Sequence, residues 1–119
     1  MTSLTITSRT TDTGPVLEIT GDLDYATAPE LRKTEDGLTL APGQLLVLDL
    51  AGLSSCDSSG ITALLAARNL AIEQEGDIVL ASVPANTTRI LRIIGLDRVF
   101  TIHPAANADT STTPRSAAG

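Results

Sequence analysis

Apolar and polar residues alternate near the start of the chain, on both sides of a turn. Residues 4–7 (Leu-Thr-Ile-Thr) alternate strictly, residues 12–15 (Asp-Thr-Gly-Pro) are typical of a turn, and residues 16–20 (Val-Leu-Glu-Ile-Thr) form a second apolar run. Two short runs of this kind around a turn indicate a β-hairpin. We therefore expect the fold to begin with two antiparallel strands.

A nearly continuous apolar run occupies residues 45–50 (Leu-Leu-Val-Leu-Asp-Leu), after a break at residues 41–43 (Ala-Pro-Gly). A run of this length predicts a central strand that is covered on both faces. Residues 51–56 are expected to form a loop, and a helix is expected from about Ser58 to Gln74. The apolar face of this helix would carry Ile61, Leu64, Leu65 and Ile72.

Another helix is expected ahead of this strand, beginning at residues 27–30 (Thr-Ala-Pro-Glu). Thr27 can cap it, Pro29 lies in its first turn, and Glu30 follows the cap by three residues, as in a capping box. Its end is placed near Leu38. The residues that would face inward are Leu31 and Thr34.

The rest of the pattern predicts a strand, a helix and a last strand. Residues 77–82 are a strand-length apolar segment, Pro84 opens a third helix that Gly95 ends, and residues 98–102 form a last short strand. The apolar side of the third helix would be supplied by Ile90, Leu91, Ile93 and Ile94.

The element order is β-β-α-β-α-β-α-β, which predicts an α/β fold. We expect one domain over residues 1–103, with a mixed four- to five-stranded sheet and helices packed on one side, since crossovers between parallel strands are right-handed. From Pro104 on, the composition shifts to Ala, Thr, Ser, Asn and Pro, which bury little apolar area. Residues 104–119 are therefore expected to form a flexible tail.

Charge and aromatic content narrow the possible functions. The net charge is −6, from 14 acidic and 8 basic residues, and Arg89, Arg92 and Arg98 form the one basic cluster. Tyr25 and Phe100 are the only aromatic residues, so stacking on single-stranded nucleic acid is disfavoured. Nucleic-acid binding is not expected.

The cysteine count and the hydropathy of the chain bear on disulfides, zinc sites and membrane segments. One cysteine, Cys56, excludes an intrachain disulfide and a cysteine-based structural zinc site, and we expect it to be a small buried apolar residue. Residues 1–4 lack a basic region followed by an apolar run, so no signal peptide is expected. No apolar run reaches transmembrane length. We expect a cytoplasmic protein that does not bind membranes.

The candidate site is Asp57-Ser58-Ser59-Gly60, where the apolar strand leads into the second helix. A helix N-terminus presents free backbone N–H groups and the positive end of the helix dipole, so it suits a bound or attached phosphate. Ser58 can therefore be a cap, a ligand contact or a phosphorylation site. Asp57 is expected to be the N-cap and Ser59 a partner of the first-turn backbone. Gly60 permits another backbone, such as that of a kinase, to approach closely.

Asp22 and Asp24 end the second strand near this motif. Their simplest interpretation is as turn and solvent-facing residues. Two neighbouring carboxylates also raise the question of a metal, but the sequence places no third ligand beside them. No metal site is expected.

Catalysis by the chain itself is not expected. A serine hydrolase needs a base beside its nucleophile, and His103 is the one histidine in the sequence. The motif is not the Gly-x-Ser-x-Gly elbow, and no Walker-type phosphate loop is present. Nucleotide binding at the helix N-terminus stays open as a weaker alternative, and no cofactor is expected.

Three segments of the chain together resemble one protein family. They are Gly21–Asp24 with Thr27–Pro29, then Leu46–Leu50 leading into Asp57–Ile61, and finally Leu91–Phe100 (Leu-Arg-Ile-Ile-Gly-Leu-Asp-Arg-Val-Phe). With these segments at this spacing, residues 4–102 resemble stand-alone STAS domains, the anti-sigma-factor antagonists of bacterial partner-switching systems.

The resemblance implies a function and its partners. The antagonist binds an anti-sigma factor that is also a serine kinase of the GHKL ATPase type, and binding frees the sigma factor. The kinase uses its own ATP and Mg²⁺ to phosphorylate the serine directly after the motif's Asp, which is Ser58 here. The phosphorylated form no longer binds, and a separate PP2C-type phosphatase restores it. The resemblance also places Asp22, Asp24 and Thr27 on the partner-binding face with the motif, and implies a monomer when free.

Phosphorylation at a helix start can act without unfolding the protein. A phosphoserine carries a charge of about −1.5 to −2, which the helix N-terminus partly accommodates. A partner would instead meet a dianion in its contact surface, and like-charge contacts at an interface cost several kcal/mol. Charge repulsion is therefore the expected means of switching.

The chain departs from the family in two places. Ser55 and Cys56 precede the motif where the family carries two larger apolar residues, so this loop can pack differently. The family ends in another amphipathic helix, which residues 103–119 do not resemble, so one flank of the third helix would be less covered. The alternative function is a STAS interaction module in another complex, either a signalling scaffold or a small subunit of a lipid-transport system.

Overall fold

The computed structural model describes residues 3–105, and it begins with the expected hairpin. Strand β1 (Leu4–Thr11) pairs antiparallel with β2 (Gly14–Leu23). Three further strands follow: β3 (Leu45–Cys56), β4 (Asp77–Val83) and β5 (Thr101–Pro104). The sheet order is β1-β2-β3-β4-β5, and β2 to β5 are parallel.

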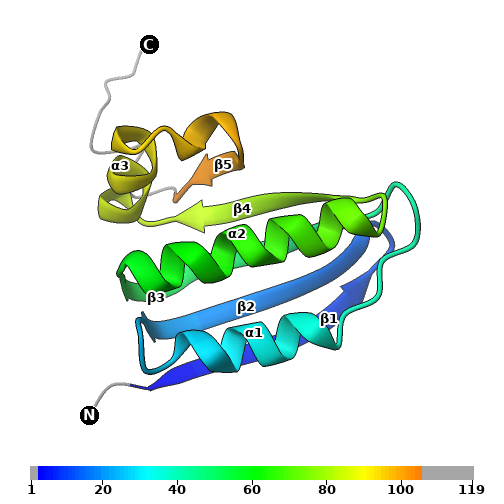
Figure 1. Ribbon diagram of the computed structural model, residues 1–119, viewed down its shortest axis with the longest axis horizontal. Coiled ribbons are helices and arrows are strands. Elements are labelled where there is room, and N and C mark those ends of the chain that lie inside the picture. The colour runs from blue at the N-terminus through cyan, green and yellow to red at the C-terminus, as the bar shows by residue number, and fades with distance from the viewer. Residues whose placement is uncertain (1–2, 106–119) are drawn as a thin grey trace.

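Helices α1 (Ala28–Asp36) and α2 (Ser58–Glu73) lie side by side across one face of this sheet (Figure 1). Helix α3 (Ala85–Ile93) follows β4 and precedes a short 3₁₀ helix, η1 (Leu96–Arg98). Because the parallel strands succeed one another in chain order, right-handed crossovers bring the helices to the same side. The predicted α/β fold, with a mixed five-stranded sheet in the order β-β-α-β-α-β-α-β, is confirmed.

The core lies between the sheet and these helices and is aliphatic apart from Phe100. Leu46, Leu48 and Leu50 of β3 are completely buried, as are Leu31 of α1 and Leu64 of α2. The residues between them on β3 are only half-buried. The prediction that residues 45–50 are covered on both faces is therefore wrong, because the helices cover one face of the sheet.

Two strand boundaries differ from the prediction. Residues 51–56, expected as a loop, continue β3, which stays paired with β2 as far as Leu23 opposite Cys56 through two register shifts. Residues 98–102, expected as a strand, divide between the end of η1 and the start of β5. In both places the strand forms by pairing with a neighbouring strand that lies elsewhere in the sequence, so the local pattern alone does not predict it.

The predicted ends and buried faces of the helices also differ from those in the structure. Helix α1 ends at Asp36 rather than near Leu38, and its inward position after Leu31 is taken by buried Glu35, while Thr34 is half-buried. On α2, Ile72 is 45% exposed rather than inward. On α3 only Leu91 of the four predicted apolar positions is buried; the exposed ones are Ile90, Ile93 and Ile94.

Strand β5 includes the first residue of the segment that was expected to form a tail. Pro104 ends β5, and the backbone N–H of Ala105 donates a hydrogen bond to the carbonyl of Val83 at 2.9 Å. The remainder of the predicted tail, residues 106–119, lies outside the described residues. Within residues 3–105, no helix combines the length and apolar character needed to cross a membrane.

One carboxyl group is buried between α1 and α2. Glu35 is 2% exposed, its Oε2 has no hydrogen-bond partner among the described residues, and the Nε of Arg32 lies 4.0 Å from its Oε1. Burial raises the pKa of Glu35 to about 8 from its ordinary value of 4.5, against the opposing charge of Arg32. Desolvation disfavours the charged form, so Glu35 holds its proton at neutral pH.

Glu35 should make the protein less stable as the pH rises from about 4.5 to about 8. In this window the folded chain keeps a proton that the unfolded chain releases, so the free energy of unfolding falls by up to about 1.4 kcal/mol per pH unit. Urea unfolding across this range should show the slope in wild type and a flatter profile in Glu35→Gln. Glu30→Gln, at an exposed position of the same helix, is the control and should keep the wild-type slope. An unchanged slope in Glu35→Gln would contradict the assignment.

The junction between β3 and α2 is packed too closely for a side chain at Gly60. A Cβ there would lie 2.6 Å from the backbone oxygen of Leu23 and 2.7 Å from the Sγ of Cys56. The backbone that approaches Gly60 closely is thus the end of β2, at Leu23 of the same chain. The absence of a side chain lets α2 begin directly against the sheet.

Gly60→Ala should lower the free energy of unfolding by about 1–3 kcal/mol, because relief of the clash requires a shift of backbone atoms. The gain in helix propensity from Gly to Ala, about 1 kcal/mol, acts in the opposite direction. Gly37→Ala is the matched control, since its nearest neighbour would be at an ordinary 3.6 Å. Denaturant unfolding of the two variants should separate them. Equal stabilities would show that α2 tolerates a side chain at this junction.

Candidate functional site at the start of helix α2

Asp57 is the N-cap of α2, as predicted. Its backbone is extended (φ −97°, ψ −170°), and its Oδ1 accepts a hydrogen bond from the backbone N–H of Gly60 at 3.0 Å. The carbonyl of Asp57 accepts the N–H of Ile61 at 3.0 Å. The side chain thereby satisfies one of the N–H groups that a helix start leaves free.

The same carboxylate reaches the turn between β2 and α1. The Oδ2 of Asp57 accepts the backbone N–H of Tyr25 at 3.2 Å, and the N–H of Asp57 donates to the carbonyl of Leu23 at 3.2 Å. The carboxyl ends of parallel strands β2 and β3 therefore place Asp22 and Asp24 beside the motif. This proximity follows from strand pairing, with Asp22 opposite Ser55.

Asp24 and Thr27 build the turn itself. The Oδ1 of Asp24 accepts the N–H groups of Ala26 and Thr27 at 3.0 and 3.1 Å. The Thr27 hydroxyl donates to the carbonyl of Asp22 at 2.7 Å and accepts the N–H of Asp24 at 2.9 Å. Thr27 occupies the N-cap position of α1, but its hydroxyl bonds backward to β2 and makes no capping bond, so the predicted capping role is wrong. At 4% exposure, Thr27 positions the turn.

Asp22 has a separate contact, since its Oδ1 accepts the hydroxyl of Ser55 at 2.8 Å. This bond joins the ends of β2 and β3 just ahead of the motif. No group of three or more His, Cys, Asp or Glu side chains that could hold a metal ion exists within residues 3–105. Asp22 and Asp24 thus serve the local structure of this edge.

Ser58 and Ser59 begin α2 and differ in exposure. Ser58 is exposed and Ser59 is half-buried, and neither hydroxyl makes a hydrogen bond within the described part of the chain. The predicted bond of Ser59 to the first-turn backbone is therefore wrong, because Asp57 accepts the N–H of Gly60. Sequence reasoning could not tell these adjacent serines apart by exposure. The structure leaves the hydroxyl of Ser58 free for an external partner.

Cys56 lies just before the motif and is half-buried. Burial, together with the neighbouring Asp57 carboxylate, raises the pKa of its thiol to about 12. A thiol in this state is not a nucleophile at neutral pH. The expectation of a small apolar residue is met in part, because the side chain is not completely covered.

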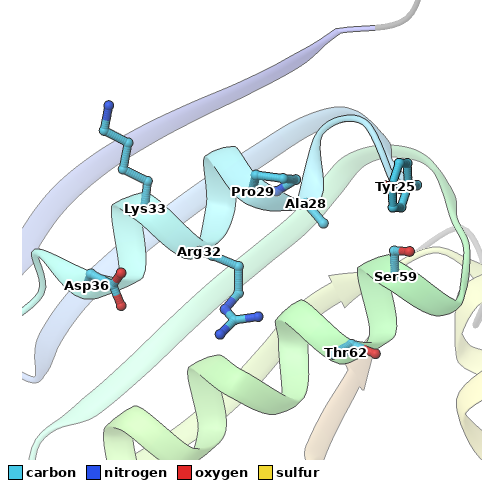
Figure 2. A pocket seen from close by; sticks show the side chains of 8 residues that line it. All are labelled: Tyr25, Ala28, Pro29, Arg32, Lys33, Asp36, Ser59 and Thr62. Atoms are coloured by element: carbon cyan, nitrogen blue, oxygen red, sulfur yellow. The ribbon is translucent and has the colours of Figure 1, made fainter.

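Two grooves lie on opposite sides of the first turns of α2, and Thr62 lines both. The groove toward α1 has a volume of about 520 Å³, and Figure 2 shows Tyr25 at one end, near Ser59, and Arg32 extending from α1 toward α2. The groove toward α3 has a volume of about 480 Å³ and includes Ser58. Sequence reasoning missed both grooves, since they depend on how the helices pack.

Solved structures share this fold. An anti-sigma factor antagonist from Mycobacterium paratuberculosis has 26% identity over 88% of this chain and 89% of its own, with a TM-score of 0.68. A sulfate transporter family protein from Wolinella succinogenes has 17% identity over 78% of each chain and a TM-score of 0.66. The anti-sigma factor antagonist SpoIIAA in its unphosphorylated form has 18% identity over 92% of this chain and 94% of its own, with a TM-score of 0.62.

The family comparison covers most of the sequence. Residues 6–103 match the family described as "Mlab, STAS domain". The match includes the ends of β2 and β3, the Asp57 cap and helices α1, α2 and α3. The chain therefore belongs to the STAS domain family.

Proposed function

We propose that this protein is an anti-sigma-factor antagonist that binds an anti-sigma serine kinase, and that phosphorylation of Ser58 switches this binding off. The observation that carries the proposal is the state of Ser58, an exposed serine at the N-terminus of α2 whose hydroxyl is unbonded within residues 3–105. A kinase needs a hydroxyl that it can reach.

The neighbours of Ser58 are occupied by the fold. Asp57 accepts two backbone N–H groups, and Gly60 is packed against the end of β2. Ser59 lines the groove on the α1 side and is half-buried. Ser58 is thus the exposed serine of the motif, and its hydroxyl makes no hydrogen bond within residues 3–105.

The phosphoryl transfer would follow from the partner's chemistry. The Oγ of Ser58 attacks the γ-phosphorus of ATP held with Mg²⁺ by a GHKL-type kinase; the O–P bond forms as the bond to ADP breaks, and the hydroxyl proton passes to a base of the kinase. This chain supplies the acceptor and has no catalytic role or cofactor of its own. A PP2C-type phosphatase would hydrolyse the phosphoserine and restore binding.

The start of α2 can carry the added phosphate. It presents backbone N–H groups and the positive end of a helix of 16 residues. The resemblance to anti-sigma factor antagonists, one of them described in an unphosphorylated form, supports the same assignment.

A STAS interaction module of another complex is the second candidate. The description of the matched family and the sulfate transporter family structure favour it. Such a module would act as a signalling scaffold or as a small subunit of a lipid-transport system. Pull-down from the native cells separates the two: a GHKL kinase supports the antagonist, and transporter subunits support the alternative.

Incubation with its kinase and ATP should add one phosphate to the wild-type protein and none to Ser58→Ala. Ser59→Ala is the matched control and should still gain the phosphate, because the half-buried Ser59 is not the acceptor. Intact mass and mapping of the modified peptide measure the outcome. Phosphate on Ser58→Ala would refute the assignment of the acceptor.

A further inference from the structure

A small pocket lies between α1 and α2, beside the second half of α2. Its volume is about 250 Å³, against about 30 Å³ for one water molecule in the liquid. Three carboxyl groups line it, those of Glu35 and Asp36 on α1 and of Glu73 on α2. Arg32 is the one cationic side chain among the described residues of the lining. Figure 2 shows Asp36 well away from Ser59, so the pocket lies apart from the start of α2.

Glu35 is the buried carboxyl group of this pocket. It is 2% exposed, whereas Asp36 and Glu73 are exposed. Its Oε2 has no hydrogen-bond partner within residues 3–105, and the Nε of Arg32 lies 4.0 Å from its Oε1, too far for a hydrogen bond. A buried polar atom without a partner is costly. The Oε2 of Glu35 is therefore an open position for a hydrogen-bond donor that enters the pocket.

The charged groups that face Glu35 come from both helices. Arg32 and Asp36 lie on its own helix, and Glu73 lines the pocket from α2. The carboxylates of Asp36 and Glu73 outnumber the guanidinium of Arg32, so the lining attracts positive charge. Within residues 3–105 these carboxyl groups do not form a metal site. An organic cation therefore fits the pocket better than a metal ion does.

We propose that this pocket binds a small organic cation with a guanidinium group, and that Glu35 releases its proton to solvent when the cation binds. The site goes beyond the proposed function, since it requires neither Ser58 nor a kinase. A guanidinium carries N–H donors in a planar fork and no acceptor, so one such group can donate to Glu35 and to a second carboxylate. A cation beside a carboxyl group favours its charged form. The proton that Glu35 holds at neutral pH therefore leaves as the ion pair forms.

Calorimetric titration of the wild-type protein with methylguanidinium is the first test. At about pH 7 the heat should depend on the ionisation enthalpy of the buffer, because close to one proton is released per bound cation. The pKa of Glu35 is about 8, so at about pH 9 the release should fall toward zero and the affinity should be about tenfold higher. Methylurea, a neutral molecule of the same shape, is the control ligand and should not bind.

Variants of the lining are the second test. Glu35→Gln keeps the size of the side chain but cannot ionise, so it should abolish binding of methylguanidinium. Glu73→Gln removes an exposed charge of the lining and should weaken binding by about two- to fivefold. Glu30→Gln, exposed on α1 and outside the lining, is the matched control and should keep the wild-type dissociation constant. Thermal unfolding verifies that each variant is folded.

Three results would overturn the site. They are equal affinity of wild type and Glu35→Gln for methylguanidinium, equal affinity of wild type for methylurea, and a heat of binding at about pH 7 that does not depend on the buffer. Absence of binding to wild type at concentrations up to about 10 mM, where the free energy of binding is only a few kcal/mol, would overturn it as well. If Glu35→Gln fails to fold, proton release by the wild-type protein still decides the question.

Discussion

The carboxylate of Asp57 holds together the edge of the sheet on which the site is built. One of its oxygens caps α2 through the N–H of Gly60, and the other accepts the N–H of Tyr25 in the turn before α1. The side chain of Asp57 therefore joins the start of α2 to the turn that precedes α1. Hydrogen bonds to an ionised acceptor are stronger than neutral ones, so this double contact gives Ser58 a defined position on a rigid frame.

Local patterns were sufficient to locate this site. The apolar run at residues 45–50 correctly predicted a strand, and Asp-Ser-Ser-Gly ahead of an apolar segment correctly predicted a helix with Asp57 as its cap. The order of strands and helices then fixed the sheet, because right-handed crossovers between neighbouring parallel strands leave few alternatives. The correct predictions came from sequence patterns within a single helix or strand and the residues directly beside it.

Features that depend on distant segments could not be predicted in this way. Residues 51–56 look like a loop in isolation and are a strand because β2 pairs with them. Thr27 lies where the sequence pattern predicts a helix cap, but its hydroxyl donates a hydrogen bond to the carbonyl of Asp22 instead. Periodicity assigned Ile90, Ile93 and Ile94 to the apolar side of the third helix, and the structure leaves all three exposed. Ile90 and Ile94 line the groove beside Ser58.

In the proposed mechanism, phosphorylation changes the surface at Ser58 and leaves the fold around it unchanged. The most direct test of this mechanism is hydrogen exchange at the backbone N–H groups of Tyr25 and Gly60 in protein that carries phosphoserine at position 58, compared with the unmodified protein. Both amides donate to Asp57, so we expect their protection to persist after phosphorylation. Loss of protection at both would show that the phosphate displaces the Asp57 carboxylate and reorganises the site, which would contradict the account.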